Sequence, residues 1–193
     1  MDRVELHDAN VTDVELILGH KDQRFASSIH DSQIASSNIE LIGNGRLLMS
    51  NSTFDDCEVV GKRASGASLQ SASWTNCTFR GKFTDCQFGH DLRRDVKVII
   101  QECDFSDADL HIVSFRGGLD FQSCRFAAWP TVLFESKQLD IPELTKRGLH
   151  PRLLSIIKVG SAREEGWLAL NVTKYDKSDF DSQERKEDSF AAF

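Results

Sequence analysis

Apolar residues recur along the middle of this chain at intervals of five. Starting at Ile29, steps of five residues meet an apolar side chain at ten of eleven positions. The series is Ile29, Ile34, Ile39, Asn44, Met49, Phe54, Val59, Ala64, Leu69, Trp74 and Phe79. An amphipathic helix repeats its apolar residues every three or four positions and a half-buried strand every two, so the spacing fits neither element. It predicts a repeat in which each five-residue unit contributes one large side chain to a shared interior.

The series continues beyond residue 79 with changes of phase. Its later members are Phe83 and Phe88, then Ile100, Phe105, Leu110 and Phe115, and finally Phe121 and Phe126. The longest interruption, the segment GHDLRRDVKVII at 89–100, predicts a loop that leaves the repeat. Such a loop can bind a partner, although an insertion without function is an equal interpretation. His90, Arg93 and Arg94 in this loop are candidate partner-binding residues.

Every cysteine of the chain stands two residues before a member of the series. Ala67, Ala72 and Ala108 occupy the same slot before other members, so the slot accepts small, buried side chains. A free thiol behaves there as a compact hydrophobic group. The pattern therefore predicts a core of alternating large and small residues. Its members are Phe54, Cys57, Leu69, Trp74, Cys77, Phe79, Cys86, Phe88, Cys103, Phe105, Leu110, Phe115, Cys124 and Phe126.

The stretch CDFSDADLHIVSF at 103–115 resembles the pentapeptide-repeat family, whose unit is written A(D/N)LXX. The units TNCTF, TDCQF, QECDF and QSCRF are similar to the same pattern, and the resemblance covers 50–126 closely and 29–49 loosely. It implies a mainly β fold, a right-handed parallel β-helix with four pentapeptides in each coil. The 20 residues between Cys57 and Cys77 agree with that coil length. About five coils fit between residues 29 and 126.

The chain divides into four predicted regions. We expect an N-terminal cap or irregular first coil at 1–28, the β-helix at 29–135, a helical C-terminal cap at 136–175 and a polar tail at 176–193. Capping-box patterns at Asp140–Glu143 and Ser161–Glu164 predict two or three short helices within 140–171. Apolar residues of those helices should cover the open end of the β-helix or bury themselves against a second subunit. They are Leu153, Leu154, Ile156, Ile157, Trp167, Leu168 and Leu170.

Composition and charge narrow the classes of partner. The chain has 193 residues and a net charge of −7, of which 1–28 carry −3, 29–135 carry −4 and 136–193 carry none. Such a surface disfavours nucleic acid and anionic membranes and favours a basic protein, although solubility alone also selects mild acidity. The acidic start, the absence of a long apolar run and the unpaired set of five cysteines predict a cytoplasmic protein with free thiols.

The sequence predicts no catalytic, metal or cofactor site. Its six histidines lack the HxxxH or HExxH spacing of common metal motifs, and inward thiols make poor ligands or nucleophiles. Carboxylates on a β-helix can hydrolyse glycosides, but outward acids on a solvated face are the simpler interpretation. We therefore predict a non-enzyme, in which four acids are candidate partner-binding residues. They are Asp104, Asp107, Asp109 and Asp120.

Two functions fit a rigid, acidic rod without catalytic groups. The first is a small inhibitor, such as an immunity protein that neutralises an antibacterial toxin, for instance a basic nuclease. The second follows from the family resemblance, because several pentapeptide-repeat proteins imitate DNA and bind DNA gyrase. The C-terminal third, which is irregular and has no net charge, favours the first function. A scaffold, or a homodimer formed through the C-terminal helices, is a further interpretation.

Overall fold

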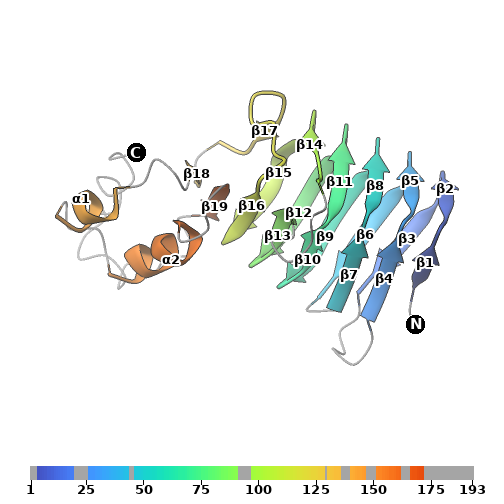
Figure 1. Ribbon diagram of the computed structural model, residues 1–193, viewed down its shortest axis with the longest axis horizontal. Coiled ribbons are helices and arrows are strands. Elements are labelled where there is room, and N and C mark those ends of the chain that lie inside the picture. The colour runs from blue at the N-terminus through green and yellow to red at the C-terminus, as the bar shows by residue number, and fades with distance from the viewer. Residues whose placement is uncertain are drawn as a thin grey trace.

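The computed structural model describes residues 4–19, 26–43, 46–90, 97–128, 130–135, 140–146, 151–161 and 166–171. It confirms the mainly β prediction, because the chain winds into a parallel β-solenoid of about five coils, and the described residues contain only two short helices (Figure 1). The helices lie beyond the C-terminal end of the solenoid, and the N-terminus lies at the opposite end. No described helix is both long and apolar enough to cross a membrane.

Each coil contributes three strands. The first two coils contain β1 (Glu5–His7), β2 (Asn10–Thr12), β3 (Glu15–Leu18), β4 (Ala26–His30), β5 (Gln33–Ala35) and β6 (Asn38–Ile42). The next two contain β7 (Arg46–Ser50), β8 (Ser52–Asp55), β9 (Glu58–Ser65), β10 (Ser68–Gln70), β11 (Ala72–Thr75) and β12 (Thr78–Thr84). The fifth coil contains β13 (Gln87–Gly89), β14 (Ile100–Gln101) and β15 (Asp104–His111). The strands β16 (Val113–Arg116) and β17 (Arg125–Phe126) follow it at the C-terminal end. The equivalent strands of successive coils form continuous sheets, with β2, β5, β8, β11 and β14 in one and β3, β6, β9, β12, β15 and β17 in another.

Large inward side chains form columns because the strands pair in register. The Phe54 ring stacks on Trp74 with centroids 4.1 Å apart, and the Phe79 ring stacks on Phe105 at 4.4 Å. Phe105 stacks in turn on Phe126 at 5.1 Å. Thirteen of the fourteen residues expected in the core are buried, and Phe126, at the end of its column, is half-buried. This continuous core holds successive coils in register.

Corners of the solenoid have a left-handed backbone residue directly before the small inward slot. Asp56, Asn76 and Asp85 stand in that position with φ of 51°, 54° and 52°. Asp and Asn adopt this conformation at lower cost than other side chains, because their short polar groups bond to the local backbone. The polar residues between the apolar positions of the repeat are therefore what allow the chain to turn.

The apolar series fails where the chain leaves the regular coil. Phe121, expected to point inward, is 38% exposed and stands in a turn that follows Gly117 and Gly118. Its ring stacks on Phe126, with centroids 5.5 Å apart, and on Trp167, at 4.2 Å. The earlier change of phase near residue 81 has a different cause, because β9 and β12 shift register between Gly81 and Phe83.

The C-terminal segment combines two helices with two antiparallel strands. It contains β18 (Thr131–Glu135), α1 (Ile141–Lys146), α2 (Pro151–Ser161) and β19 (Trp167–Asn171). β19 pairs antiparallel with both β16 and β18, and its apolar residues pack with α2 in a second small core. The members of that core are Phe134, Leu154, Ile157, Leu168 and Leu170.

Two details of this segment differ from the sequence-based expectation. Trp167–Asn171 was expected to be helical but is a strand, because the open edge of β16 offers backbone groups that only a strand can pair. Ser161 does not cap a new helix, since it is the last residue of α2. Asp140 does cap α1, accepting a hydrogen bond from the Glu143 backbone N–H at 3.0 Å. Residues 172–193, with the expected polar tail, lie outside the described residues.

Candidate functional site

The four acids expected to bind a partner are held in separate local interactions. The Asp104 carboxylate accepts a bond from the Ser106 N–H at 2.9 Å and lies 2.7 Å from the Arg125 guanidinium. The hydrogen bonds from Ser106, followed by Arg125, lower the pKa of Asp104 below its ordinary value. Asp107 lies 3.8 Å from Arg80. These two carboxylates are therefore neutralised by neighbouring strands.

The other two acids support the backbone near the C-terminal end. Asp109 accepts a hydrogen bond of 2.6 Å from the Asn171 amide, which joins β15 to β19. Asp120 accepts the N–H groups of Gln122 and Ser123 and so holds a turn. The four acids thus do not form one cluster.

The expected loop is only partly described. His90 lies at the start of the loop, where its Nδ1 accepts a hydrogen bond from the Val98 N–H at 3.2 Å. The backbone N–H of His90 donates to the Arg116 carbonyl at 2.8 Å. This histidine therefore anchors the returning chain. Arg93 and Arg94 lie outside the described residues.

The outer face of the longest sheet carries paired charges. Arg80 on β12 lies 3.1 Å from Glu58 on β9, besides its contact with Asp107 on β15. Lys62 on β9 lies 2.5 Å from Glu40 on β6, beside a shallow groove that Arg63 and Lys82 also line. Positive and negative groups alternate from coil to coil, so this face is not continuously acidic.

The N-terminal end of the solenoid has a different character. β1, β2 and β3 are the terminal strands of their sheets, and within the described part of the chain no strand pairs with their outer edges. The inward residues of this coil are half-buried, whereas their partners one coil further in are buried. Those inward residues are Leu6, Val11 and Leu16. Exposed acids surround the end, namely Glu5, Asp8, Asp13 and Glu15. We call these strands and acids the N-terminal rim.

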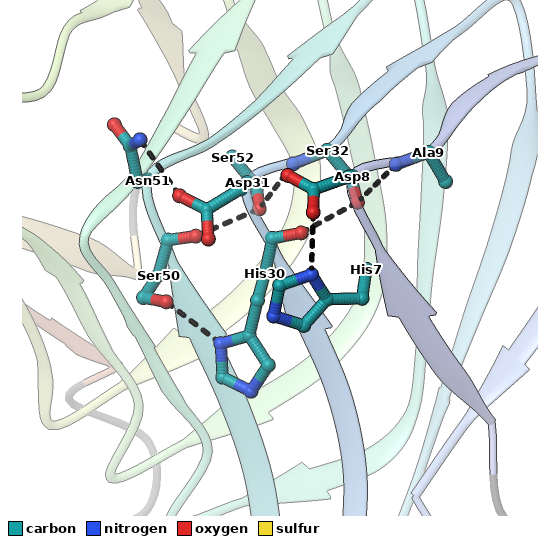
Figure 2. A network of polar contacts seen from close by, with 9 residues as sticks. All are labelled: His7, Asp8, Ala9, His30, Asp31, Ser32, Ser50, Asn51 and Ser52. Atoms are coloured by element: carbon teal, nitrogen blue, oxygen red, sulfur yellow. Dashed lines mark hydrogen bonds and ion pairs between the residues drawn. The ribbon is translucent and has the colours of Figure 1, made fainter.

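One corner of the N-terminal rim gathers groups that can bind a metal ion. His7, Asp8 and Asp31 each place one ligand atom within 4.8 Å of the other two, and all three side chains are exposed. The His7 Nδ1 lies 3.0 Å from a carboxylate oxygen of Asp8. Figure 2 shows the two carboxylates, from successive coils, on the same side of the corner. No other group of this kind occurs among the described residues.

A search for linear metal motifs misses this corner, because its ligands come from two coils. The informative pattern is the dipeptide His-Asp, which occurs three times, at 7–8, 30–31 and 90–91, and of these the first two lie one coil apart. The register of β1 with β4 places His7 opposite His30 and therefore stacks the two dipeptides. A spacing of one coil is the property that a sequence search would need to test.

No family model, curated protein or solved structure matches this chain. The class of protein is therefore defined by its architecture, a parallel β-solenoid with a capped C-terminal end.

Proposed function

We propose that this chain is a divergent pentapeptide-repeat protein that acts as a non-enzymatic inhibitor. In this proposal it is a cytoplasmic immunity protein that neutralises an antibacterial toxin, for instance a nuclease, by direct binding. The repeated unit supports the family, because each small inward side chain precedes a large one by two residues, as in Cys77 and Phe79. The function is supported chiefly by the N-terminal rim.

The N-terminal rim combines the two properties that a protein-binding surface of this kind needs. No strand of the described residues pairs with its outer strand edges, and a strand from another protein can pair with such an edge. Its exposed acids attract a basic partner and increase the rate of encounter. A basic strand is therefore the partner segment that best fits both properties.

The DNA-mimic alternative receives less support. A mimic needs rows of negative charge that stand in for phosphates, whereas the outer face of the longest sheet alternates in sign. Exposed acids occur both at the rim and along the solenoid, as at Asp55 and Asp56, so the alternating sign of the longest sheet is the observation that argues against mimicry. DNA gyrase is for this reason the second candidate partner.

The test begins with affinity capture of the tagged protein from the lysate of its own host and identification of bound proteins by mass spectrometry. The recovered protein is then produced alone, and its dissociation constant is measured against the wild type and two double variants. Asp13→Lys/Glu15→Lys reverses two charges of the rim, and Asp55→Lys/Asp56→Lys reverses two exposed charges near the middle of the solenoid.

We expect a basic toxin whose affinity falls at least ~10-fold for the rim variant and much less for the mid-solenoid variant. Gyrase supercoiling, assayed in parallel, should be unaffected. Recovery of gyrase with loss of supercoiling would instead support DNA mimicry. Equal loss of affinity in both variants would show that the rim is not the binding surface.

A further inference from the structure

We propose that the corner formed by His7, Asp8 and Asp31 binds one divalent transition-metal ion, with Zn²⁺ as the best fit. The proposal is independent of the inhibitor function. It rests on the geometry of the three ligand atoms and on the repetition of the His-Asp dipeptide in register.

The distances suit a small ion. Ligands that bind Zn²⁺ in a tetrahedron at about 2.0 Å lie about 3.3 Å from one another. The His7 Nδ1 and the Asp8 carboxylate oxygen are 3.0 Å apart, and the Asp31 oxygen lies within 4.8 Å of both. The hydrogen bond between His7 and Asp8 would give way to two bonds to the ion. Small rotations of exposed side chains are sufficient to bring the third ligand to the ion.

The donor set decides which class of ion fits. Imidazole nitrogen and carboxylate oxygen are both ligands that Zn²⁺ accepts. Mg²⁺ and Ca²⁺ prefer oxygen ligands alone and take six or more of them. Three protein ligands would leave a fourth tetrahedral position for water or for a group of a partner.

Repetition in successive coils makes the arrangement more than a chance contact. The N–H of Asp8 donates to the carbonyl of His30, and the N–H of Asp31 donates to the carbonyl of Ser50, so both acids stand at the same corner. Two carboxylates stacked one coil apart repel each other, and a cation between them removes that repulsion. The stack therefore has an electrostatic reason to bind a cation.

Neighbouring side chains hold the ligands in place. The Asn51 amide, next in the same corner column, donates to Asp31 at 2.9 Å (Figure 2). The His30 ring lies 6.0 Å from the His7 ring, and its Nδ1 is hydrogen-bonded to the Ser50 hydroxyl at 2.7 Å. Groups that orient metal ligands in this way increase metal affinity. Asn51 thus orients the Asp31 carboxylate, and His30 packs beside the His7 ring.

The experiment uses the full chain after removal of any histidine tag. ZnCl₂ is titrated into the wild type and into three variants by calorimetry, and Co²⁺ absorption reports the coordination geometry. His7→Gln and Asp31→Asn each remove one ligand. The control, Asp56→Asn, removes an exposed acid with the same left-handed backbone. Asp56 accepts a hydrogen bond from the Ser36 hydroxyl and belongs to no His-containing cluster among the described residues.

We expect the wild type to bind one equivalent of Zn²⁺ and to form a Co²⁺ complex with tetrahedral absorption. Each ligand variant should bind at least ~10-fold more weakly, and Asp56→Asn should bind like the wild type. Circular dichroism establishes that each variant is folded, and the two ligand variants test the site separately. Failure of the wild type to bind one equivalent, or equal binding by all four proteins, would overturn the proposal.

Discussion

At the residue scale, the small inward slot accepts compact side chains, either alanine or a residue whose donor bonds to a nearby carbonyl. Ser37 fills it in an early coil, where its hydroxyl donates to the Ala35 carbonyl at 2.6 Å. One coil later Cys57 fills it, and its thiol donates to the Asp55 carbonyl at 3.3 Å. The equivalent geometry shows that cysteine acts here as a buried donor of the right size. The slot therefore explains the cysteine spacing without any disulfide.

Reactivity along the cysteine column should differ sharply between its members. The neighbouring thiol of the next coil, followed by burial, raises the pKa of Cys77 and Cys103 to about 12. Cys124 ends the column and receives a hydrogen bond from the Cys103 thiol, which lowers the pKa of Cys124 to about 7. The thiolate is the reactive form, so Cys124 should be alkylated by iodoacetamide first at pH 8.

Peptide mass spectrometry of the folded protein measures this order. Cys124→Ser should remove the fast phase of alkylation and leave the slow one. Fast modification of Cys77 or Cys103 in native protein would contradict the buried column.

The pKa of Asp104 makes a second prediction, on acid stability. Because its pKa is lowered in the fold, the Asp104 carboxylate stabilises the native state above its ordinary pKa of 3.8, and this contribution is lost as the pH falls below that value. Asp104→Asn should therefore lower the free energy of unfolding by about 0.5–1 kcal/mol at pH 7. The difference from the wild type should shrink at pH 3. Urea titrations at the two pH values measure it, and a difference independent of pH would contradict the assignment.

At the element scale, glycines are required where the long strands pass a corner. Gly81 on β12 has φ of +83°, and a Cβ at this position would lie 2.6 Å from the carbonyl oxygen of Gly61 in the neighbouring strand. Gly66 also has positive φ, at +66°, but a Cβ there would meet no atom within 4 Å. Substitution of Gly66 therefore introduces backbone strain alone, whereas substitution of Gly81 adds a steric conflict between coils.

Gly66→Ala should therefore cost about 1 kcal/mol of stability, because it introduces only the left-handed strain. Gly81→Ala should cost about 2 kcal/mol more, since β9 and β12 must also move apart. Urea unfolding followed by circular dichroism gives both values. Equal costs would show that the two strands adjust freely at this corner.

The sequence predicted those elements whose side-chain pattern is local and repeated. The step of five and the cysteine slot predicted the columns through Trp74, Phe79 and Phe105, because each unit repeats the same local geometry. The strand Trp167–Asn171 was not predicted, since its conformation depends on the edge of β16, which is distant in sequence. The corner of His7 with Asp31 was missed for the same reason, because the register between coils brings it together.

At the scale of the whole molecule, the two ends of the solenoid are treated differently. At the C-terminal end, β19 pairs with β16 and covers one sheet edge, and Trp167 stacks on Phe121. At the other end, the outer edges of β1, β2 and β3 have no partner strand within the described residues. An open edge can pair with another copy of the chain, and charged residues beside it oppose that association. The exposed acids of the N-terminal rim can therefore keep two copies apart while still attracting a basic partner.

Neutralising part of the rim should consequently promote self-association. Asp13 and Glu15 are both exposed beside the open edges, and Asp13→Asn/Glu15→Gln removes two negative charges while keeping side-chain size. In the wild type, the N-terminal rims of two copies repel each other because both are acidic. The variant weakens this repulsion and should therefore form a larger species in sedimentation equilibrium at about 0.05 M NaCl. Added salt screens exposed charges, and the wild type should approach the variant at 0.5 M NaCl. Asp55→Asn/Asp56→Asn, the matched control, loses the same charge far from the edge and should sediment like the wild type. If both variants associate equally, total charge rather than the position of the rim prevents association; if neither does, the open edge is not competent to pair.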